Sequence, residues 1–376
     1  MIKTNQLKKN IPNEWQEEKL GKHIKLEYGF SLPDRKREDG DFPVFGSSGI
    51  VGSHKEALVK GPGIIVGRKG TIGSVIWSDK DFCPIDTTYY TTINFSIYLR
   101  WLYYELQFLK LNKMNTASGV PGLNREEVYK LNILIPTKLE QEKIAEILSK
   151  VDEDIEKTEE VIKETEKLKN GLMQELLTKG FKNTKFKKME LKNIGEIITG
   201  NTPRTLERDN YGGDYLLVSP KDIGLTKYIN DSENRLSERG YKLTRKIPKD
   251  SILVVCIGST IGKIAITGRE LSTNQQINSV IVDNNYSNEY VYYQLLYRRS
   301  EIIDKRSTQA VPLLNKSDFS ELEITIPERR DDQEKIAEIL SSVDEKISVN
   351  KKLKEKLTQL KKGLMSDLLS GKIRTI

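Results

Sequence analysis

The chain has 376 residues, of which 37% are hydrophobic and 31% charged, and its formal net charge is +7. This length predicts two or three domains with folded cores, and the basic balance suits a polyanionic partner. No apolar run could span a bilayer, the N-terminus is too polar for a secretory signal, and two histidines cannot assemble a zinc cluster. We expect a cytoplasmic protein without a metal site, in which Cys83 and Cys256 are buried thiols.

Residues 1–137 are predicted to form a first globular domain. A helix is expected over 96–112, with leucines and Tyr103 on one side. Short apolar runs separated by glycines indicate strands and loops, at 42–46, 63–67, 74–77 and 131–136.

Residues 138–180 are predicted to form one long helix. Its apolar positions recur at alternating steps of four and three, at Ile144, Leu148, Val151, Ile155 and Ile162. This spacing is a heptad seam flanked by Glu and Lys, so the helix needs a partner along that stripe. A helix of about forty residues would run roughly 60 Å.

A second domain is expected over 181–327, followed by a second long helix over 328–376. The lysine-rich stretch 179–192 is interpreted as a solvated linker rather than a phosphate contact. The second helix has one charged step at Lys354, and its seam comprises Ile336, Leu340, Val343, Ile347, Leu357 and Leu364.

The two halves of the chain are an internal repeat. Residues 141–149 and 333–341 are identical, at an offset of 192 (333 − 141), and Gly-Leu-Met recurs at 171 and 363. The globular segments match more loosely, as in Tyr103–Leu106 and Tyr292–Leu295. Two unrelated surface helices, each on its own domain, would not explain copies this similar.

The predicted fold class is therefore α+β, with two similar mixed or β-rich domains separated by a long antiparallel two-helix coiled coil and a pseudo-two-fold internal repeat. Antiparallel pairing is preferred because a parallel pair would force the connector to return the full helix length. Two basic modules related by a two-fold axis fit a ligand with a dyad, and duplex DNA is one.

No catalytic site is expected. The glycines of 61–67 miss the dinucleotide-binding spacing by one residue. The stretch 258–264 is one residue short of a phosphate-binding loop and has Ile264 where a magnesium-binding hydroxyl should stand. Tight turns explain both stretches, and no Gly-x-Ser-x-Gly elbow occurs.

With these features in hand, the chain resembles the specificity (S) subunit of Type I restriction–modification systems. The resemblance rests on the twin helices, their Gly-Leu-Met turns, and the stretches 67–73, 200–203 and 211–214. It implies two target-recognition domains, each reading one half of a split double-stranded DNA sequence, and paired helices that act as a ruler and dock two modification subunits. It also implies that S-adenosylmethionine, ATP and magnesium belong to partner subunits, including restriction subunits, and that this chain holds no cofactor.

The candidate DNA-binding residues are polar or basic side chains on predicted loops. Arg68 is as well explained by a surface ion pair as by guanine recognition, and Ser47 and Ser48 suit a turn better than a base contact. Thr116 and Ser118 could contact phosphate or cap a turn. The full candidate set is Ser47, Ser48, His54, Lys55, Arg68, Lys69 and Thr71 in the first domain, and Thr202, Arg204, Lys221, Ser259, Thr260, Gln275 and Gln276 in the second. Adjacent Gln275 and Gln276 would face opposite ways in a strand, so at most one should read adenine.

Two other functions remain open at this point. A protein–protein scaffold joining two partners would bind without regard to DNA and with little salt dependence. A stand-alone DNA methyltransferase or nuclease would modify DNA without any partner.

Overall fold

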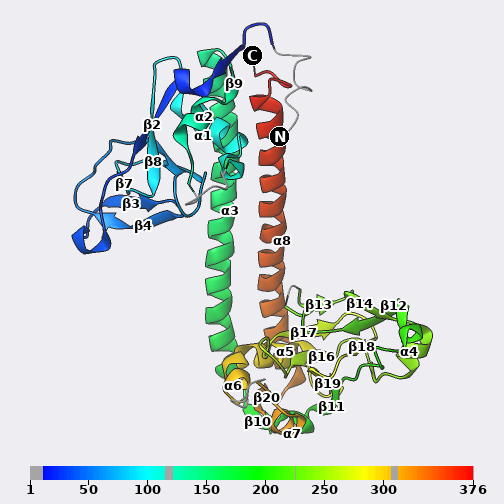
Figure 1. Ribbon diagram of the computed structural model, residues 1–376. Coiled ribbons are helices and arrows are strands. Elements are labelled where there is room, and N and C mark those ends of the chain that lie inside the picture. The colour runs from blue at the N-terminus through cyan, green and yellow to red at the C-terminus, as the bar shows by residue number, and fades with distance from the viewer. Residues whose placement is uncertain (1–11, 115–121, 225, 306–311, 376) are drawn as a thin grey trace. The chain divides into compact units, whose positions relative to one another are not determined.

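The computed structural model describes residues 12–114, 122–224, 226–305 and 312–375 (Figure 1). The candidates Thr116 and Ser118 lie outside the described residues. The chain divides into two compact units: unit 1 contains residues 1–160 and 351–376, and unit 2 contains residues 161–350. Each unit holds one β-rich module and a part of each of the two long helices.

The module of unit 1 is built on an antiparallel four-stranded sheet. Its strand order is β2 (Ile24–Tyr28), β8 (Thr88–Ile93), β5 (Gly63–Gly67) and β6 (Val75–Ser78). A smaller sheet has the order β4 (Gly49–His54), β3 (Phe42–Gly46) and β7 (Cys83–Pro84), with β3 and β7 parallel. Strand β1 (Gln16–Lys19) pairs antiparallel with β9 (Asn132–Ile135), which closes the module. The helices are α1 (Leu99–Phe108) and α2 (Arg125–Tyr129).

The module of unit 2 repeats this plan with additions. The larger sheet runs β11 (Gly195–Thr199), β19 (Ile277–Val282), β16 (Ile252–Val255), β17 (Ile264–Thr267) and β13 (Tyr228–Ile229). The smaller sheet runs β14 (Asn234–Leu236), β12 (Tyr211–Val218), β18 (Leu271–Thr273) and β15 (Lys246–Ile247). The closing pair is β10 (Phe186–Glu190) with β20 (Glu323–Pro327). The helices are α4 (Glu238–Lys242), α5 (Asn288–Tyr297), α6 (Arg299–Asp304) and α7 (Lys316–Ser320).

The two modules therefore share one scaffold. The order β2-β8-β5-β6 corresponds to β11-β19-β16-β17, and the parallel pair β3/β7 corresponds to β12/β18. Strands β13 and β15 are extra in the second module. Small capping details are copied too: Asn124 caps α2 and Asn315 caps α7, each accepting a backbone N–H with its side chain.

Each module is joined to its long helix by an equivalent glutamine of the repeat. Gln141 Oε1 accepts the Tyr98 N–H at 2.7 Å, at the start of α1, and Gln333 Oε1 accepts the Ser287 N–H at 2.9 Å, at the start of α5. Each amide also donates to the carbonyl of a strand-ending proline, Pro136 or Pro327. The repeated Gln-Glu-Lys-Ile-Ala sequence thus begins with a residue that ties two helices and a strand together.

The long helices α3 (Lys138–Thr178) and α8 (Arg330–Leu369) pack together, and ion pairs give their direction within unit 1. Lys361 of α8 pairs with Asp152 of α3 at 2.6 Å, and Lys354 pairs with Glu159 at 2.8 Å. A step of seven residues toward the N-terminus of α8 is thus matched by seven residues toward the C-terminus of α3, which is antiparallel pairing. The charged step at Lys354 is satisfied by Glu159.

The predicted seam lies inside this packing. In unit 1, Ile144 and Leu148 share a core with Leu368 and Leu369 of α8. In unit 2, Met173, Leu176 and Leu177 of α3 share a core with Ile336 and Leu340 of α8. Seam positions are buried at Ile144, Leu148, Val151, Ile162, Ile336, Leu340 and Ile347, and half-buried at Ile155, Val343, Leu357 and Leu364.

Unit 1 also brings chain segments distant in sequence around one buried carboxylate. The Glu140 side chain accepts from Trp15 Nε1 at 2.8 Å and pairs with Arg374 Nε at 2.6 Å. Arg374 further contacts Glu14 at 3.0 Å. A carboxylate with no solvent exposure is tolerated here because a guanidinium and an indole N–H satisfy it.

The fold class predicted from the sequence is confirmed, and two of the finer predictions need correction. The solvated linker over 179–192 is wrong for Phe186–Glu190, which forms β10, and for Leu191, which is fully buried. The helix expected over 96–112 is shorter, because its first turn starts after Tyr98 and Lys110 adopts a positive φ of 52°. Within the described ranges, no helix is long and apolar enough to cross a membrane.

Candidate nucleic-acid interface

In the first module, two loops that the sequence marked as candidates contact each other. The β3–β4 turn contains Ser47, whose Oγ accepts the Thr71 N–H at 3.3 Å. Ser74 Oγ donates to the Ser47 carbonyl, so the turn and the 67–74 loop are joined twice. Ser47 is 9% exposed and has a structural role, whereas Ser48, Lys69 and Thr71 are exposed on this surface.

Arg68 belongs to a cluster of arginine and tyrosine side chains. Its Nε and Nη2 both donate to the Asp86 carbonyl, at 3.1 and 2.8 Å. Its guanidinium carbon lies 5.0 Å from the centre of the Tyr28 ring, and the Arg125 guanidinium lies 4.8 Å from the same ring. Tyr28 is half exposed. An exposed aromatic ring in contact with two guanidinium groups is the kind of surface that binds nucleic acid by stacking and charge.

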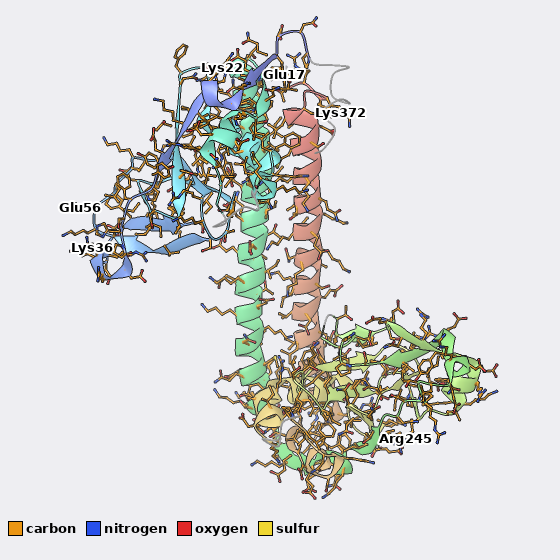
Figure 2. All side chains as sticks on the ribbon, viewed as in Figure 1. Glu17, Lys22, Lys36, Glu56, Arg245 and Lys372 are labelled. Carbon is orange, nitrogen blue, oxygen red and sulfur yellow. The ribbon has the colours of Figure 1, made fainter. Side chains whose placement is uncertain are left out.

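The side chains of His54 and Lys55 both contact Glu38 on a neighbouring loop. His54 Nδ1 accepts the Glu38 N–H at 3.1 Å, and Lys55 Nζ lies 2.9 Å from the Glu38 carboxylate. Lys55 lowers the pKa of Glu38 below its ordinary value by hydrogen bonding and charge. Figure 2 labels Lys36 and Glu56 in this part of the module.

In the second module, Thr202 and Gln275 come together from separate loops. Thr202 Oγ1 donates to Gln275 Oε1 at 2.9 Å, and Gln275 is exposed. The Gln276 amide is instead used within the protein: its Oε1 accepts from Asn274 at 2.9 Å, and its Nε2 donates to the Ile257 carbonyl at 3.3 Å. Of the two adjacent glutamines, Gln275 is therefore the one placed to meet a ligand.

The remaining candidates of the second module are on its surface. Arg204, Lys221 and Ser259 are exposed, and Thr260 is half-buried. Lys221 faces Glu233 at 3.9 Å. The loop that carries Ser259 and Thr260 spans from Val255 to Lys263, which are hydrogen-bonded to each other, as Gly67 and Ser74 are in the first module. The second loop is one residue longer, so the two loops differ in length as well as in sequence.

Beneath the first module's sheet, a polar cluster joins α1 to both long helices. Tyr104 donates to Asp152 Oδ2 at 2.8 Å, its hydroxyl oxygen lies 3.1 Å from Ser149 Oγ, and Lys361 Nζ lies 5.3 Å from the Tyr104 ring centre. Burial, above all, raises the pKa of Tyr104. Arg100 donates to Ser149 at 3.0 Å and lies over the ring of Trp77 at 4.5 Å.

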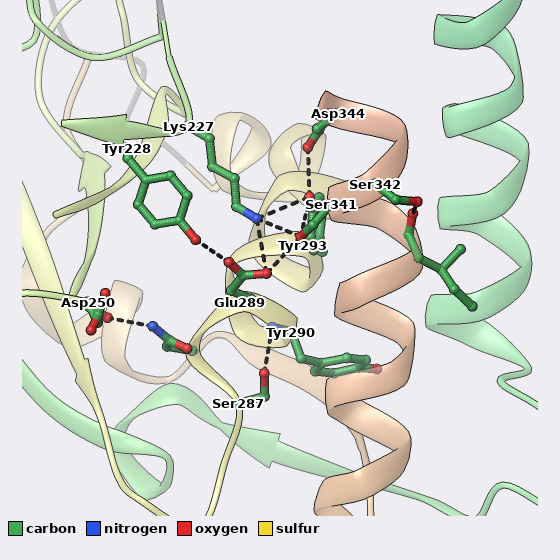
Figure 3. Close-up of polar contacts among 12 residues, drawn as sticks. Lys227, Tyr228, Asp250, Ser287, Glu289, Tyr290, Tyr293, Ser341, Ser342 and Asp344 are labelled. Atoms are coloured by element: carbon green, nitrogen blue, oxygen red, sulfur yellow. Dashed lines mark hydrogen bonds and ion pairs between the residues drawn. The ribbon is translucent and has the colours of Figure 1, made fainter. Parts of the chain in front are cut away.

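Unit 2 has a matching cluster (Figure 3). Tyr293 donates to Asp344 Oδ2 at 2.7 Å and lies 3.2 Å from Ser341 Oγ. Lys169 Nζ of α3 pairs with Asp344 at 2.6 Å. The arrangement is that of Tyr104, Ser149, Asp152 and Lys361, each replaced by its repeat counterpart. The position of Arg100 is taken by Glu289, and the cation comes from Lys227 of the sheet edge.

Charges in this second cluster are balanced. Burial lowers the pKa of Lys227, and Glu289 opposes that shift. Burial raises the pKa of Glu289, but hydrogen bonds from Tyr228 and Ser341 and the charge of Lys227 outweigh it, so its pKa lies below the ordinary value. The cluster combines two lysines with two carboxylates, which makes their burial tolerable.

Neither cysteine is placed for nucleophilic chemistry. Cys83 and Cys256 are free and buried, as predicted. Burial raises the pKa of the Cys256 thiol to about 12 and also raises that of Cys83, which disfavours the reactive thiolate. Among the described residues, no group of three His, Cys, Asp or Glu side chains could hold a metal ion.

Comparison with known proteins decides the family. The profile of the Type I restriction modification DNA specificity domain matches residues 12–167 and again 183–359. The chain belongs to this family. The two matches coincide with the two module-and-helix repeats.

Individual members of the Type I specificity family agree with the assignment. The HindI specificity subunit of Haemophilus influenzae is 33% identical over 191 residues, which is 49% of this chain and 40% of that protein. The MjaIX specificity subunit of Methanocaldococcus jannaschii is 34% identical over 177 residues, 46% of this chain and 40% of that protein. The aligned segments thus span less than half of these two relatives.

The fold of the Type I specificity family is recovered across the chain. The crystal structure of a Type I restriction–modification S subunit from M. genitalium superimposes with a TM-score of 0.72. The alignment covers 96% of this chain and 98% of that chain at 20% sequence identity. At this identity the likeness concerns the fold.

Several residues of these clusters escaped the sequence reasoning. Tyr28 and Lys227 lie in stretches with no repeat partner of the same type, and Arg125 is matched only by the lysine Lys316. Lys169 and Lys361 carried a usable signal, because they are 192 residues apart, as Asp152 and Asp344 are. A search for polar residues shared by both repeats would have found these pairs.

Proposed function

We propose that this chain is the non-catalytic DNA-specificity subunit of a Type I restriction–modification complex. The first module reads one half of a bipartite duplex target, and the second module reads the other half. The proposal rests on membership of the specificity family in both repeats and on two modules that share one scaffold.

The observation that carries this function is a contrast between two sets of residues. One set attaches each module to the long helices, and the other lies on the loops of the modules. The anchoring residues are duplicated: Gln141 and Gln333 make the same contacts, as do the two Tyr–Ser–Asp–Lys clusters. The loops on the modules differ, with Arg68-Lys69 in one and Ile257-Gly258 at the corresponding place in the other. Two modules that read different half-sites need the same attachment to the long helices and different DNA-contacting residues.

The surface of the first module suits duplex DNA. Arg68 uses Nε and one N–H of Nη2 for the Asp86 carbonyl, so the two N–H groups of Nη1 and the second N–H of Nη2 can reach a base edge or phosphate. Arg125, Lys69 and Lys55 add positive charge, and Thr71 and Ser48 add hydroxyl groups. In the second module, Thr202, Arg204, Lys221, Ser259 and Gln275 are the corresponding set.

The methyl-transfer chemistry belongs to partners in this proposal. Both long helices carry exposed apolar residues at matching repeat positions: Val161 and Leu168 on α3, and Leu353 and Leu360 on α8. Each pair is seven residues apart, so it presents one apolar stripe on its helix. We propose that each stripe docks one of two modification subunits, which bind S-adenosylmethionine, and that the complex works in the cytoplasm, where restriction subunits with ATP and magnesium join it.

Methylome sequencing tests the proposal. The chain would be expressed with and without an adenine-methylating partner in a host that lacks both. An interrupted, two-part adenine motif that requires both proteins is expected. Methylation by the partner alone at that motif would contradict a specificity role. Methylation by this chain alone would make it an enzyme, and partner binding without any effect on DNA sequence choice would make it a protein scaffold.

A further inference from the structure

Lys227 connects the sheet edge of the second module directly to helix α8. Its backbone carbonyl accepts the N–H of Ile266 in β17 at 2.8 Å. Lys227 therefore lies beside β17 and directly precedes the edge strand β13, which pairs with β17. Its ammonium group lies 2.8 Å from Ser341 Oγ of α8 (Figure 3). One side chain thus spans from the edge of the sheet to the long helix.

The surroundings of the ammonium group hold it in one place. Glu289 of α5 lies 3.2 Å away and the Tyr293 hydroxyl 3.3 Å away. The rings of Tyr292 and Tyr293 lie 5.4 and 4.7 Å from it. Only 15% of the lysine side chain is exposed. A lysine this enclosed, with a carboxylate, two hydroxyls and two aromatic faces, has little freedom to adopt another rotamer.

Glu289 completes the connection. Its Oε2 accepts from Ser341 Oγ at 2.7 Å, and its Oε1 accepts from the hydroxyl of Tyr228 on β13. The edge strand, the module helix α5 and the long helix α8 therefore meet in one hydrogen-bonded cluster. Movement of the sheet relative to α8 would break several of these contacts together.

The first module is attached differently. Arg100 occupies the repeat position of Glu289 and donates to Ser149 from α1 itself. The edge strand β6 reaches this cluster through Trp77, whose ring faces the Arg100 guanidinium at 4.5 Å. A ring face constrains direction less than a charged hydrogen bond does. In the second module, by contrast, the edge of the sheet is connected to α8 by the hydrogen-bonded ammonium group of Lys227.

We propose that Lys227 is a positioning residue that fixes the orientation of the second recognition module on α8. Through that orientation it sets the spacing and helical phase at which the second half-site is accepted. The inference rests on the proposed reading of a bipartite target. Lys227 does not contact bases in this account, so it governs spacer length and leaves half-site sequence alone.

The test uses the full chain in complex with its modification partner. Adenine methylation rates are measured on duplexes that carry both half-sites with the preferred spacer, or with a spacer one base pair shorter or longer. Lys227→Met should reduce the preference for the native spacer about tenfold, the change expected when one charge-assisted hydrogen bond no longer distinguishes two geometries. Lys227→Arg, which keeps the cation, should retain most of the preference.

Two further variants keep the test decisive. Ser341→Ala removes the α8 side of the link and leaves Lys227 beside Glu289, so it should also broaden the accepted spacers. Lys192→Met is the matched control, because this exposed lysine pairs with Glu190 of the same module at 2.8 Å. It should leave spacer preference unchanged.

Each other outcome overturns the inference. Unchanged spacer preference in both Lys227→Met and Ser341→Ala, or equal loss at every spacer length, would reduce the cluster to a stabilising role. Altered half-site sequence would make Lys227 a DNA contact. Failure of the wild-type complex to methylate any two-part duplex would instead refute the proposed function, which is a separate result.

Discussion

Lys361 Nζ lies 2.6 Å from Asp152 Oδ1, and its repeat counterpart Lys169 Nζ lies 2.6 Å from Asp344 Oδ1. In each pair one residue comes from α3 and the other from α8, with the roles of the helices exchanged. A tyrosine hydroxyl from the module helix reaches each aspartate. The same four-residue contact therefore joins a module helix to both long helices in each unit. The internal duplication has kept the residues that attach each module to the helix pair.

The Asp152 contact should stabilise unit 1 measurably. Asp152→Asn removes the charge opposite Lys361, which is only 17% exposed, and should lower the free energy of unfolding by about 1–3 kcal/mol. All three tryptophans, Trp15, Trp77 and Trp101, lie in unit 1, so tryptophan fluorescence during urea unfolding reports on this unit.

The control for this prediction is Glu159→Gln. Glu159 pairs with Lys354 in the same helix pair, but 63% of its side chain is exposed, so the loss should stay below about 0.5 kcal/mol. Equal losses in the two variants would show that burial does not distinguish the pairs.

Glu105 should make unit 1 less stable as pH rises. Complete burial raises its pKa to about 8, and neither its Oε2 nor the nearby buried Trp101 Nε1 has a hydrogen-bond partner. The folded state thus holds a proton that the unfolded chain releases near the ordinary value of 4.5. Stability is fully present below that pH and is lost progressively up to about pH 8.

Glu105→Gln should remove this pH dependence. Glutamine stands at the repeat position, where Gln294 donates to the Leu177 carbonyl at 2.9 Å and to Tyr290 at 2.8 Å. At pH 9 the variant should be more stable than wild type by roughly 2–5 kcal/mol, with little difference at pH 4.5. Urea unfolding followed by tryptophan fluorescence at both pH values measures it, and parallel pH profiles would disprove the assignment.

Arg68 should determine one half of the DNA target. Arg68→Ala removes the guanidinium over Tyr28 and should weaken methylation of the cognate first half-site by about 10- to 100-fold, with the second half-site preference intact. Methylation rates on duplexes that vary one half-site at a time measure this effect. Lys80→Ala, on an exposed turn of the same module, serves as the control. A uniform loss across all sequences would reassign Arg68 to phosphate binding.

Binding of DNA by the complex should depend steeply on salt. If the exposed lysines and arginines of both modules contact phosphates, the logarithm of the affinity should fall linearly with the logarithm of salt concentration, with a slope of about −0.9 per phosphate contacted. Fluorescence anisotropy between low and moderate salt measures the slope. Lys69→Ala and Lys221→Ala should each reduce its magnitude by about one. A slope near zero would favour the protein scaffold.

Sequence patterns predicted the fold well where periodicity or repetition carried the information. Strands β3 and β5 have the predicted bounds, and the heptad positions lie in or beside the helix–helix core. The strand β10 was missed because its lysines resemble a solvated linker, and only pairing with β20 reveals its role. Local composition cannot show a long-range partner.

The candidate site was less predictable. The sequence alone could not show that Ser47 and Gln276 use their polar groups inside the protein, because their hydrogen-bond partners, Thr71 and Ile257, lie far from them along the chain. Lys227 and Arg125 gave no local signal, because their importance lies in rings and carboxylates contributed by distant elements. The repeat located the anchoring contacts, and the structure was needed to locate the arginine–tyrosine surface.

The central claim is that two modules on one repeated scaffold each read a separate half-site. The most direct test is to map the DNA methylation produced with a chain whose second module is replaced by a copy of the first. Residues 186–327 would be replaced by residues 15–136, which join the closing strand pair at equivalent positions. Because α3 and α8 pair antiparallel, the methylated motif should become an interrupted inverted repeat of the first half-site. A motif that keeps two different halves would contradict the assignment of one half-site to each module.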